Sequence, residues 1–162
     1  VKEWQDKTTS SSHNDLGQTQ EHITKTYTIA MKALPSGVYE VPCKINDLPL
    51  KFILDTGASD VTISSTDAKF MLKNNYLHSQ DIIGKRRYLT ASGDIIEGTK
   101  IKLRTIQIGE LELRNVEASI VHNQDAPLLL GQSVLKRLGR YNIDSSKSIL
   151  TITTSESLIR TQ

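Results

Sequence analysis

Phe52-Ile53-Leu54-Asp55-Thr56-Gly57-Ala58-Ser59 is the segment that decides the fold of this chain. Three apolar residues lead the carboxylate of Asp55 into a turn that contains Thr56 and Gly57. Gly57 has no Cβ, so backbone N–H groups can approach that carboxylate closely and offset its loss of water. Asp-Thr-Gly also occurs as an ordinary structural turn after a strand. Other parts of the sequence are therefore needed to distinguish a structural turn from a functional site.

Short strands are predicted on both sides of this segment. Residues 38–45 alternate between apolar and polar side chains, and Asn46-Asp47 forms a turn into the strand 48–54. Pro42 indicates an edge position or a bulge. The same reasoning, with turns at Ser92-Gly93, Gly109-Glu110 and residues 145–147, predicts strands or hairpins over residues 27–31, 61–63, 82–90, 95–103, 104–113, 116–121, 140–144 and 149–153.

Helical patterns are short. Residues 64–67 offer N-cap side chains for a helix over 67–73, which Asn74 and Asn75 would end. A second amphipathic run covers 133–138, with Gly139 as its C-cap. The chain is therefore predicted to be all-β and barrel-like, with one or two short helices.

The 162 residues suit one domain with a real core. Residues 1–26 are rich in Ser, Thr, Gln, Asp and Lys, and we expect them to form a flexible polar arm. The folded domain is expected over 27–154, and a polar tail over 155–162.

The composition argues against nucleic-acid binding, an internal disulfide and a metal site. The net charge is only +2, aromatic residues make up 5%, and the one basic triplet, Lys85-Arg86-Arg87, is typical of a solvated strand edge, so no nucleic-acid partner is expected. The single cysteine, Cys43, excludes an internal disulfide and is interpreted as a small buried strand residue. The four histidines are scattered without ligand spacing, so no metal is expected.

Three motifs in order point to one family. Asp55–Ser59 after an apolar run resembles the signature of aspartic proteases, the Ser92-Gly93 hairpin lies where these enzymes carry their flap, and Leu129-Leu130-Gly131 before a short helix lies where they thread a loop behind the catalytic turn. The resemblance covers roughly residues 37–152. It is strongest to the bacterial single-domain retropepsin-like proteases, and residues 128–152 also resemble the retropepsin domains of DNA-damage-inducible proteins. It implies a retropepsin-type closed β-barrel, the acid-protease fold.

The resemblance also implies a homodimer. Aspartic protease chemistry needs two carboxylates that share a proton, and this sequence holds one Asp-Thr-Gly. Asp60, Asp94 and Asp144 lack the Thr-Gly context. The second Asp55 is therefore expected from a second copy of the chain, which gives a symmetric aspartic endopeptidase that acts on polypeptides and needs no cofactor. The alternative is a non-catalytic peptide-binding or dimerisation module on the same fold.

Residue roles follow from the same resemblance. The catalytic set is Asp55, Thr56 and Gly57, and Leu129, Leu130 and Gly131 are expected to support it from behind. The substrate-binding set is expected to comprise Ala58, Ser59, Asp60 and the flap tip, which consists of Thr90, Ala91, Ser92, Gly93 and Asp94.

Two departures from the family pattern lead to further expectations. Ala58 replaces a hydroxyl residue of pepsin-like enzymes, and the loss of that donor favours a mildly acidic working pH. Ser59 and Gln132 stand where viral enzymes have an Asp–Arg ion pair, so we expect a neutral hydrogen bond between them.

The last predicted hairpin covers residues 140–153. The hairpin is expected to bring Tyr141, Ile143, Ile149, Leu150 and Ile152 to the dimer contact or to the core beneath it.

By resemblance, the expected location is periplasmic or membrane-tethered. Since the sequence begins at Val1, a membrane anchor upstream is compatible with it.

Overall fold

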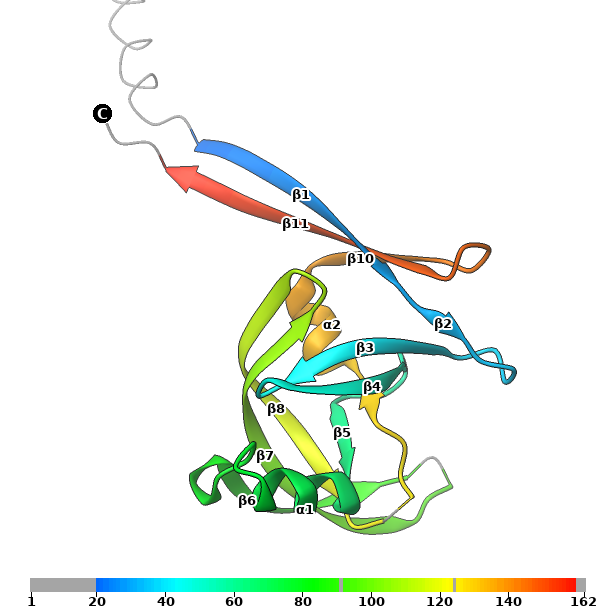
Figure 1. Cartoon of the computed structure of the whole chain (residues 1–162), viewed down its shortest axis with the longest axis vertical. Coiled ribbons are helices and arrows are strands. Elements are labelled where there is room, and N and C mark those ends of the chain that lie inside the picture. Colours follow the sequence, from blue (N-terminus) through cyan, green and yellow to red (C-terminus); the bar gives the residue numbers. More distant parts are fainter. Residues whose placement is uncertain (1–19, 91, 124, 160–162) are drawn as a thin grey trace, which may run out of the picture. The chain divides into compact units, whose positions relative to one another are not determined.

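The computed structural model describes residues 20–90, 92–123 and 125–159. Strands dominate this part of the chain, so the all-β prediction is confirmed (Figure 1). The strands are β1 (Gln20–Ala30), β2 (Lys32–Ala33), β3 (Tyr39–Ile45), β4 (Leu48–Leu54), β5 (Val61–Ser64), β6 (Ile82–Leu89), β7 (Ile95–Ile108), β8 (Leu111–Val121), β9 (Leu129–Leu130), β10 (Arg140–Asp144) and β11 (Ile149–Ile159). The helices are α1 (Ser65–Lys73) and α2 (Gln132–Leu138), and a 3₁₀ turn covers Ser79–Asp81.

The chain divides into two compact units. Residues 26–153 form the larger unit, and among the described residues 20–25 and 154–159 belong to the other. Residues 20–26 of the predicted polar arm belong to β1, and residues 155–159 of the predicted tail belong to β11. Alternation could not reveal these strand ends because their sequences are polar, whereas strand pairing uses backbone groups that every residue carries. Residues 1–19 and 160–162 lie outside the described residues.

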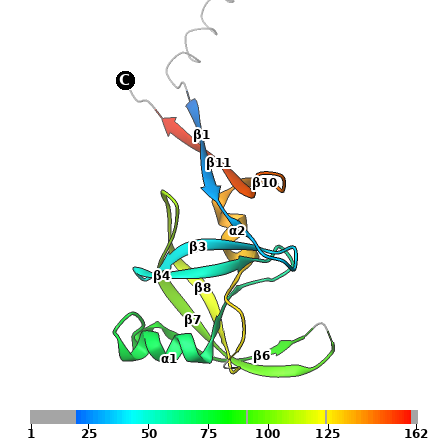
Figure 2. The ribbon, with the colours of Figure 1, turned by 45° about the vertical axis from the view of Figure 1, so that its right-hand side comes forward.

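One large sheet builds most of the larger unit. Its strand order is β2-β3-β4-β9-β5-β8-β7-β6, and β3 additionally pairs with β7. The pairings therefore form a closed series, in which each strand has a neighbour on both sides. The series runs β3, β4, β9, β5, β8 and β7, and β7 pairs back to β3. Figure 2 shows the β6–β7 hairpin projecting from this sheet. A second sheet has the order β1-β11-β10.

The turns fall where the sequence placed them, with one difference. Asn46 and Asp47 adopt positive φ angles of 47° and 68° between β3 and β4, as expected of a tight hairpin turn. β7 is one continuous strand of 14 residues, although the sequence suggested separate strands on either side of residue 104. Neither Gly nor Pro interrupts residues 99–108, so no residue there breaks the strand.

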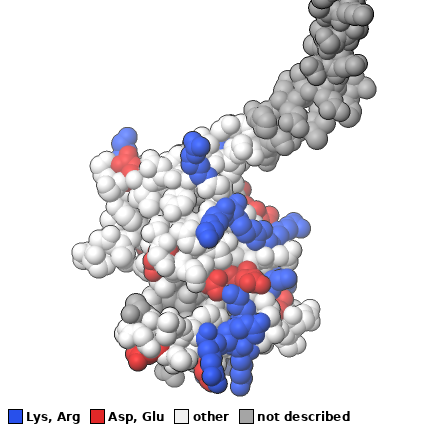
Figure 3. All heavy atoms as spheres, turned by 180° about the vertical axis from the view of Figure 1, so that it is seen from behind, with Lys and Arg blue, Asp and Glu red and all other residues white. Residues whose placement is uncertain are grey.

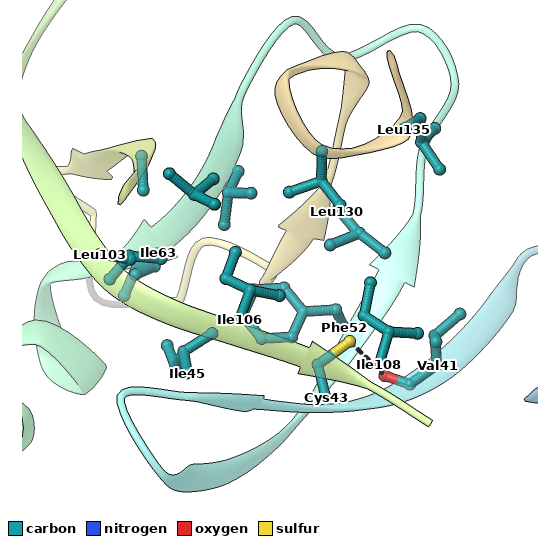
Figure 4. Packing of buried hydrophobic residues seen from close by; sticks show 14 of the residues in the cluster. Val41, Cys43, Ile45, Phe52, Ile63, Leu103, Ile106, Ile108, Leu130 and Leu135 are labelled. Atoms are coloured by element: carbon teal, nitrogen blue, oxygen red, sulfur yellow. Dashed lines mark hydrogen bonds between the residues drawn. The ribbon is translucent and has the colours of Figure 1, made fainter. Parts of the chain in front are cut away.

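The core lies inside the large sheet. Apolar side chains from β3, β4, β7 and β9 converge there in Figure 4, and Phe52, Ile106 and Leu130 are almost fully buried. Leu150 and Ile152 are also buried, so these two residues of the last hairpin belong to the core. Burial of apolar area of this kind is the main force that holds such a domain together.

Cys43 belongs to the same core, which confirms its interpretation as a buried strand residue. Its Sγ lies 3.7 Å from the Val41 carbonyl oxygen (Figure 4). Burial raises the pKa of the thiol to about 12. The thiol therefore stays protonated at neutral pH, where it is a poor nucleophile.

Both helices end at the expected residues, but α1 begins at Ser65 instead of residue 67 and α2 begins at Gln132 instead of residue 133. Ser64 caps α1, because its Oγ accepts a hydrogen bond from the backbone N–H of Asp67 at 3.1 Å. Asn74 ends α1, and Gly139 ends α2 with a φ of 105°. Neither helix in the described ranges has the length and apolar character that crossing a bilayer requires.

Lys85, Arg86 and Arg87 are exposed on β6, the outermost strand of the large sheet. This confirms that the basic triplet lies at a solvated strand edge. On the face drawn in Figure 3, Lys and Arg side chains stand beside Asp and Glu side chains rather than forming an unbroken basic surface.

Candidate active site

The turn after β4 holds Asp55 in a defined orientation. Leu54 is buried and Asp55 is half-buried, so the strand delivers the carboxylate to the edge of the core. The backbone N–H of Gly57 donates to Asp55 Oδ1 at 3.0 Å, and the N–H of Ala58 donates to the Asp55 carbonyl at 3.2 Å. A Cβ on Gly57 would lie 3.4 Å from Asp55 Oδ1, which shows how closely the backbone approaches the carboxylate. Thr56 and Gly57 are exposed in the single chain.

A second segment passes directly behind this turn. β9 lies between β4, to which it is parallel, and β5, to which it is antiparallel. The N–H of Ile53 donates to the Leu128 carbonyl at 2.7 Å, and the N–H of Asp55 donates to the Leu130 carbonyl at 3.1 Å. The Asp55 turn is thus attached by its backbone to residues more than 70 positions later.

Gly131 is the point of closest approach. A Cβ added there would lie 2.6 Å from the Ala58 carbonyl oxygen and would also collide with the Asp60 carbonyl oxygen. Its φ is −108°, so the glycine is required by lack of space and not by a left-handed backbone. Immediately after it, the N–H groups of Gln132 and Ser133 donate to the carbonyls of Ala58 and Ser59, each at 2.8 Å.

The expected Ser59–Gln132 side-chain bond is replaced by a different one. Gln132 Nε2 donates to the carbonyl oxygen of Thr56 at 2.7 Å. Ser59 is exposed and contacts this segment through its own carbonyl. The predicted neutral hydrogen bond of Gln132 is present, but its partner is the Thr56 carbonyl and not the Ser59 side chain. The longer Gln side chain reaches the backbone of the turn itself.

The flap tip is held by short-range hydrogen bonds. Thr90 N donates to the Asp94 carbonyl at 2.8 Å, and Gly93 N donates to the Thr90 carbonyl at 3.0 Å. The Thr90 and Ser92 hydroxyls lie 2.9 Å apart, and the N–H of Asp94 donates to Thr90 Oγ1 at 3.0 Å. Ala91 lies outside the described residues.

Two apolar side chains beside this tip are exposed to solvent. Leu89 and Ile95 face each other across the hairpin and are 75% and 68% exposed. A cavity of about 820 Å³ lies next to the hairpin. The residues that line it are Thr90, Ile96 and Glu97 from the hairpin, Val121 at the end of β8, and His122, Asn123 and Asp125 from the segment that follows β8.

Asp60 has partners that the sequence did not predict. Its Oδ2 lies 2.6 Å from Lys100 Nζ and 2.8 Å from the Ser119 hydroxyl, and the Ser119 hydroxyl also lies 2.8 Å from the Tyr88 hydroxyl. The Asp60 side chain therefore points towards β7 and β8, and its Oδ2 accepts hydrogen bonds from both Lys100 and Ser119. No local motif could reveal this group, because its members come from four separate segments of the chain.

The electrostatics of Lys100 fit a maintained ion pair. Burial lowers the pKa of Lys100, but the hydrogen bond and charge of Asp60, with smaller contributions from Tyr88 and Glu117, raise it above the ordinary value. Lys100 therefore stays charged throughout the neutral range. Both side chains of the pair are mostly buried, at 17% and 18% exposed.

The sequence matches a known family. Residues 41–137, more than half of the chain, match the family described as "gag-polyprotein putative aspartyl protease". The chain belongs to the retropepsin-like aspartic proteases. Within them, it is similar to the crystal structure of a retropepsin-like aspartic protease from Rickettsia conorii, with a TM-score of 0.61 and 26% identity over 86% of this chain and 98% of that one.

Two curated relatives are longer than this retropepsin-like chain. An uncharacterized protein, RP867, from Rickettsia prowazekii is 34% identical over 116 residues, which are 70% of this chain and 47% of the relative. Protein DDI1 homolog 2 of Xenopus tropicalis is 27% identical over 145 residues, 84% of this chain and 34% of the relative. The chain thus spans about half or less of the length of these relatives.

Proposed function

We propose that this chain is an aspartic endopeptidase that works as a symmetric homodimer. The observation that carries the proposal is a single Asp55, oriented by Gly57 and attached to β9, in a sequence with only one Asp-Thr-Gly. Two carboxylates are needed to share the proton that this chemistry uses, and a second copy of the chain supplies the second one. The exposure of Thr56 and Gly57 in the single chain is compatible with a partner at that surface.

In the proposed reaction, a water molecule lies between the two Asp55 carboxylates. The ionised carboxylate accepts a proton from this water, whose oxygen attacks the scissile carbonyl carbon. The protonated carboxylate gives its proton to the carbonyl oxygen. When the tetrahedral intermediate breaks down, the carboxyl group that took the proton from water gives it to the amide nitrogen and the C–N bond breaks. The other carboxylate takes a proton from a hydroxyl of the intermediate, which restores the starting state of the two carboxyl groups. The hairpin that carries Thr90–Asp94 closes over an extended polypeptide, which it holds by backbone hydrogen bonds.

The conservative variant Asp55→Asn tests the chemistry. It keeps the size of the side chain and the acceptor oxygen for Gly57 but removes the ionisable group. We expect cleavage of an unstructured protein at mildly acidic pH to fall by about a thousandfold or more, roughly 4 kcal/mol of transition-state stabilisation. Retained folding is checked by thermal unfolding. Unchanged cleavage in the variant would rule out Asp55 as the catalytic group.

A mixing experiment tests the shared site. Above the dimerisation concentration, a threefold excess of Asp55→Asn chain should reduce the activity of a fixed amount of wild-type chain to about one quarter, since most wild-type chains then pair with inactive ones. Sedimentation should detect the dimer. A monomer at all concentrations, without cleavage at any pH, would favour the non-catalytic peptide-binding module instead.

We also propose a periplasmic or membrane-tethered location. Only the resemblance to bacterial single-domain retropepsin-like proteases supports it. Fractionation of cells that express the full-length protein is the test, and recovery only in the cytoplasmic fraction would contradict it.

A further inference from the structure

Four side chains from four segments meet beneath the flap hairpin. Tyr88 comes from β6, Lys100 from β7, Ser119 from β8, and Asp60 from the loop between the catalytic turn and β5. We call these four residues the flap-base network. It lies within the larger unit, and its first member is two residues before Thr90 at the flap tip.

The proton arrangement of the network can be assigned from chemistry. The Ser119 hydroxyl lies 2.8 Å from both Asp60 Oδ2 and the Tyr88 hydroxyl, but it has one proton to donate. A carboxylate is the stronger acceptor, so Ser119 donates to Asp60 and Tyr88 donates to Ser119. Lys100 donates to the same Asp60 oxygen at 2.6 Å. The chain of bonds thus runs from Tyr88 through Ser119 to Asp60.

Tyr88 reaches Ser119 across an intervening strand, and a glycine makes this crossing possible. A Cβ on Gly98 of β7 would lie 2.7 Å from the Tyr88 ring and 2.8 Å from the Ile120 carbonyl oxygen. Gly98 is buried, and its φ is not in the left-handed region that favours glycine. The glycine therefore serves to let the tyrosine ring pass over β7, and any larger residue would push the ring away from β8.

At its other end, the network is attached to the catalytic turn. Asp60 is five residues after Asp55, and its carbonyl oxygen is one of the two atoms that leave no room for a Cβ on Gly131. Lys100 and Asp60 are mostly buried, so displacing Asp60 would leave Lys100 with only its longer ion pair to Glu117, at 3.6 Å. The bonded arrangement is therefore strongly preferred over a loose one.

We propose that the flap-base network is a positioning unit that sets the flap hairpin at a fixed place relative to the loop that carries the catalytic turn. Tyr88 is the positioning residue on the flap side, and it acts through Ser119 and Asp60 rather than by touching substrate. This inference rests on the proposed proteolytic function. It predicts that loss of the Tyr88 hydroxyl loosens the hairpin and weakens substrate capture without altering the reacting groups.

The variants Tyr88→Phe and Ser119→Ala, singly and combined, test this with two readouts. We expect amide hydrogen exchange in residues 84–90 and 95–100 to rise about tenfold in either single variant. We expect KM for a peptide substrate to rise about fivefold, with kcat changed less than twofold. Because the two hydroxyls act in one chain of bonds, the double variant should resemble the singles instead of adding their effects. Tyr76→Phe, at a ring that stacks on Phe70 away from the network, is the matched control.

The outcomes separate the network from the proposed function. If the wild-type chain cleaves nothing, the proposed function fails and this inference fails with it. If the wild-type chain cleaves but Tyr88→Phe matches Tyr76→Phe in both readouts, only the network proposal is overturned. Faster exchange with an unchanged KM would also overturn it, because the hydroxyl would then be structural without positioning the flap for substrate.

Discussion

The Asp55 turn and the tip of the β6–β7 hairpin are both short loops in one sheet, but they are held in different ways. The turn at Asp55 is attached by backbone bonds to Leu128 and Leu130, far away in the sequence, and lies against a glycine with no free space. The tip at Thr90–Asp94 is held by bonds among its own residues, and a Cβ on Gly93 would meet nothing within 4 Å.

Under the proposed function, this difference gives the chain a rigid site and a cover that can open. Long-range backbone bonds to a buried strand break only when a large part of the unit unfolds, whereas local bonds at an exposed tip open at little cost. The turn should therefore keep its geometry while the tip rearranges. That division of roles fits the proposed function, in which the hairpin closes over a bound polypeptide.

The largest expected effect comes from filling the space behind the turn. Gly131→Ala should lower the free energy of unfolding by about 3 kcal/mol or more, because the new methyl group collides with two backbone carbonyls that cannot move independently. Thermal or urea unfolding measures this. A loss below about 1 kcal/mol would show that the β9 segment can shift, and the contrast between turn and tip would then be wrong.

These two loops also show how far the sequence can be interpreted. The Asp55 turn, the Ser92-Gly93 tip and the Leu129–Gly131 segment each have a local signature, so sequence alone located all three and predicted the all-β class. The family resemblance placed the third segment behind the turn, but it did not reveal the side-chain contacts around these segments. Gln132 bonds to the Thr56 carbonyl and Asp60 pairs with Lys100, and both contacts depend on which strands become neighbours after folding.

The same substitution at the tip should have a smaller effect with a different cause. Gly93→Ala meets no clash, but Gly93 has a φ of 90°, which an L-residue adopts only with strain. We expect a loss of about 1 kcal/mol in the free energy of unfolding, or less if the exposed tip relaxes locally. Faster amide exchange confined to residues near the tip would identify that relaxation. An effect as large as that of Gly131→Ala would contradict the view that the tip is independent of the core.

The smallest effect on stability is expected at Thr90, and it tests whether the tip's local bonds matter for closure rather than for folding. Thr90→Val keeps the shape of the side chain but removes the hydroxyl that accepts from Asp94 N and lies 2.9 Å from the Ser92 hydroxyl. Exposed polar contacts of this kind contribute about 0.5 kcal/mol or less to folding, since water replaces them when they are lost. The melting temperature should therefore barely change, while KM for a peptide rises severalfold because the closed tip is less well ordered. Ser92→Ala, which keeps the Thr90–Asp94 bond, should have a weaker effect on KM. If Thr90→Val instead lowers stability as much as Gly93→Ala does, the tip is part of the cooperative fold, and its opening would require more than the loss of local hydrogen bonds.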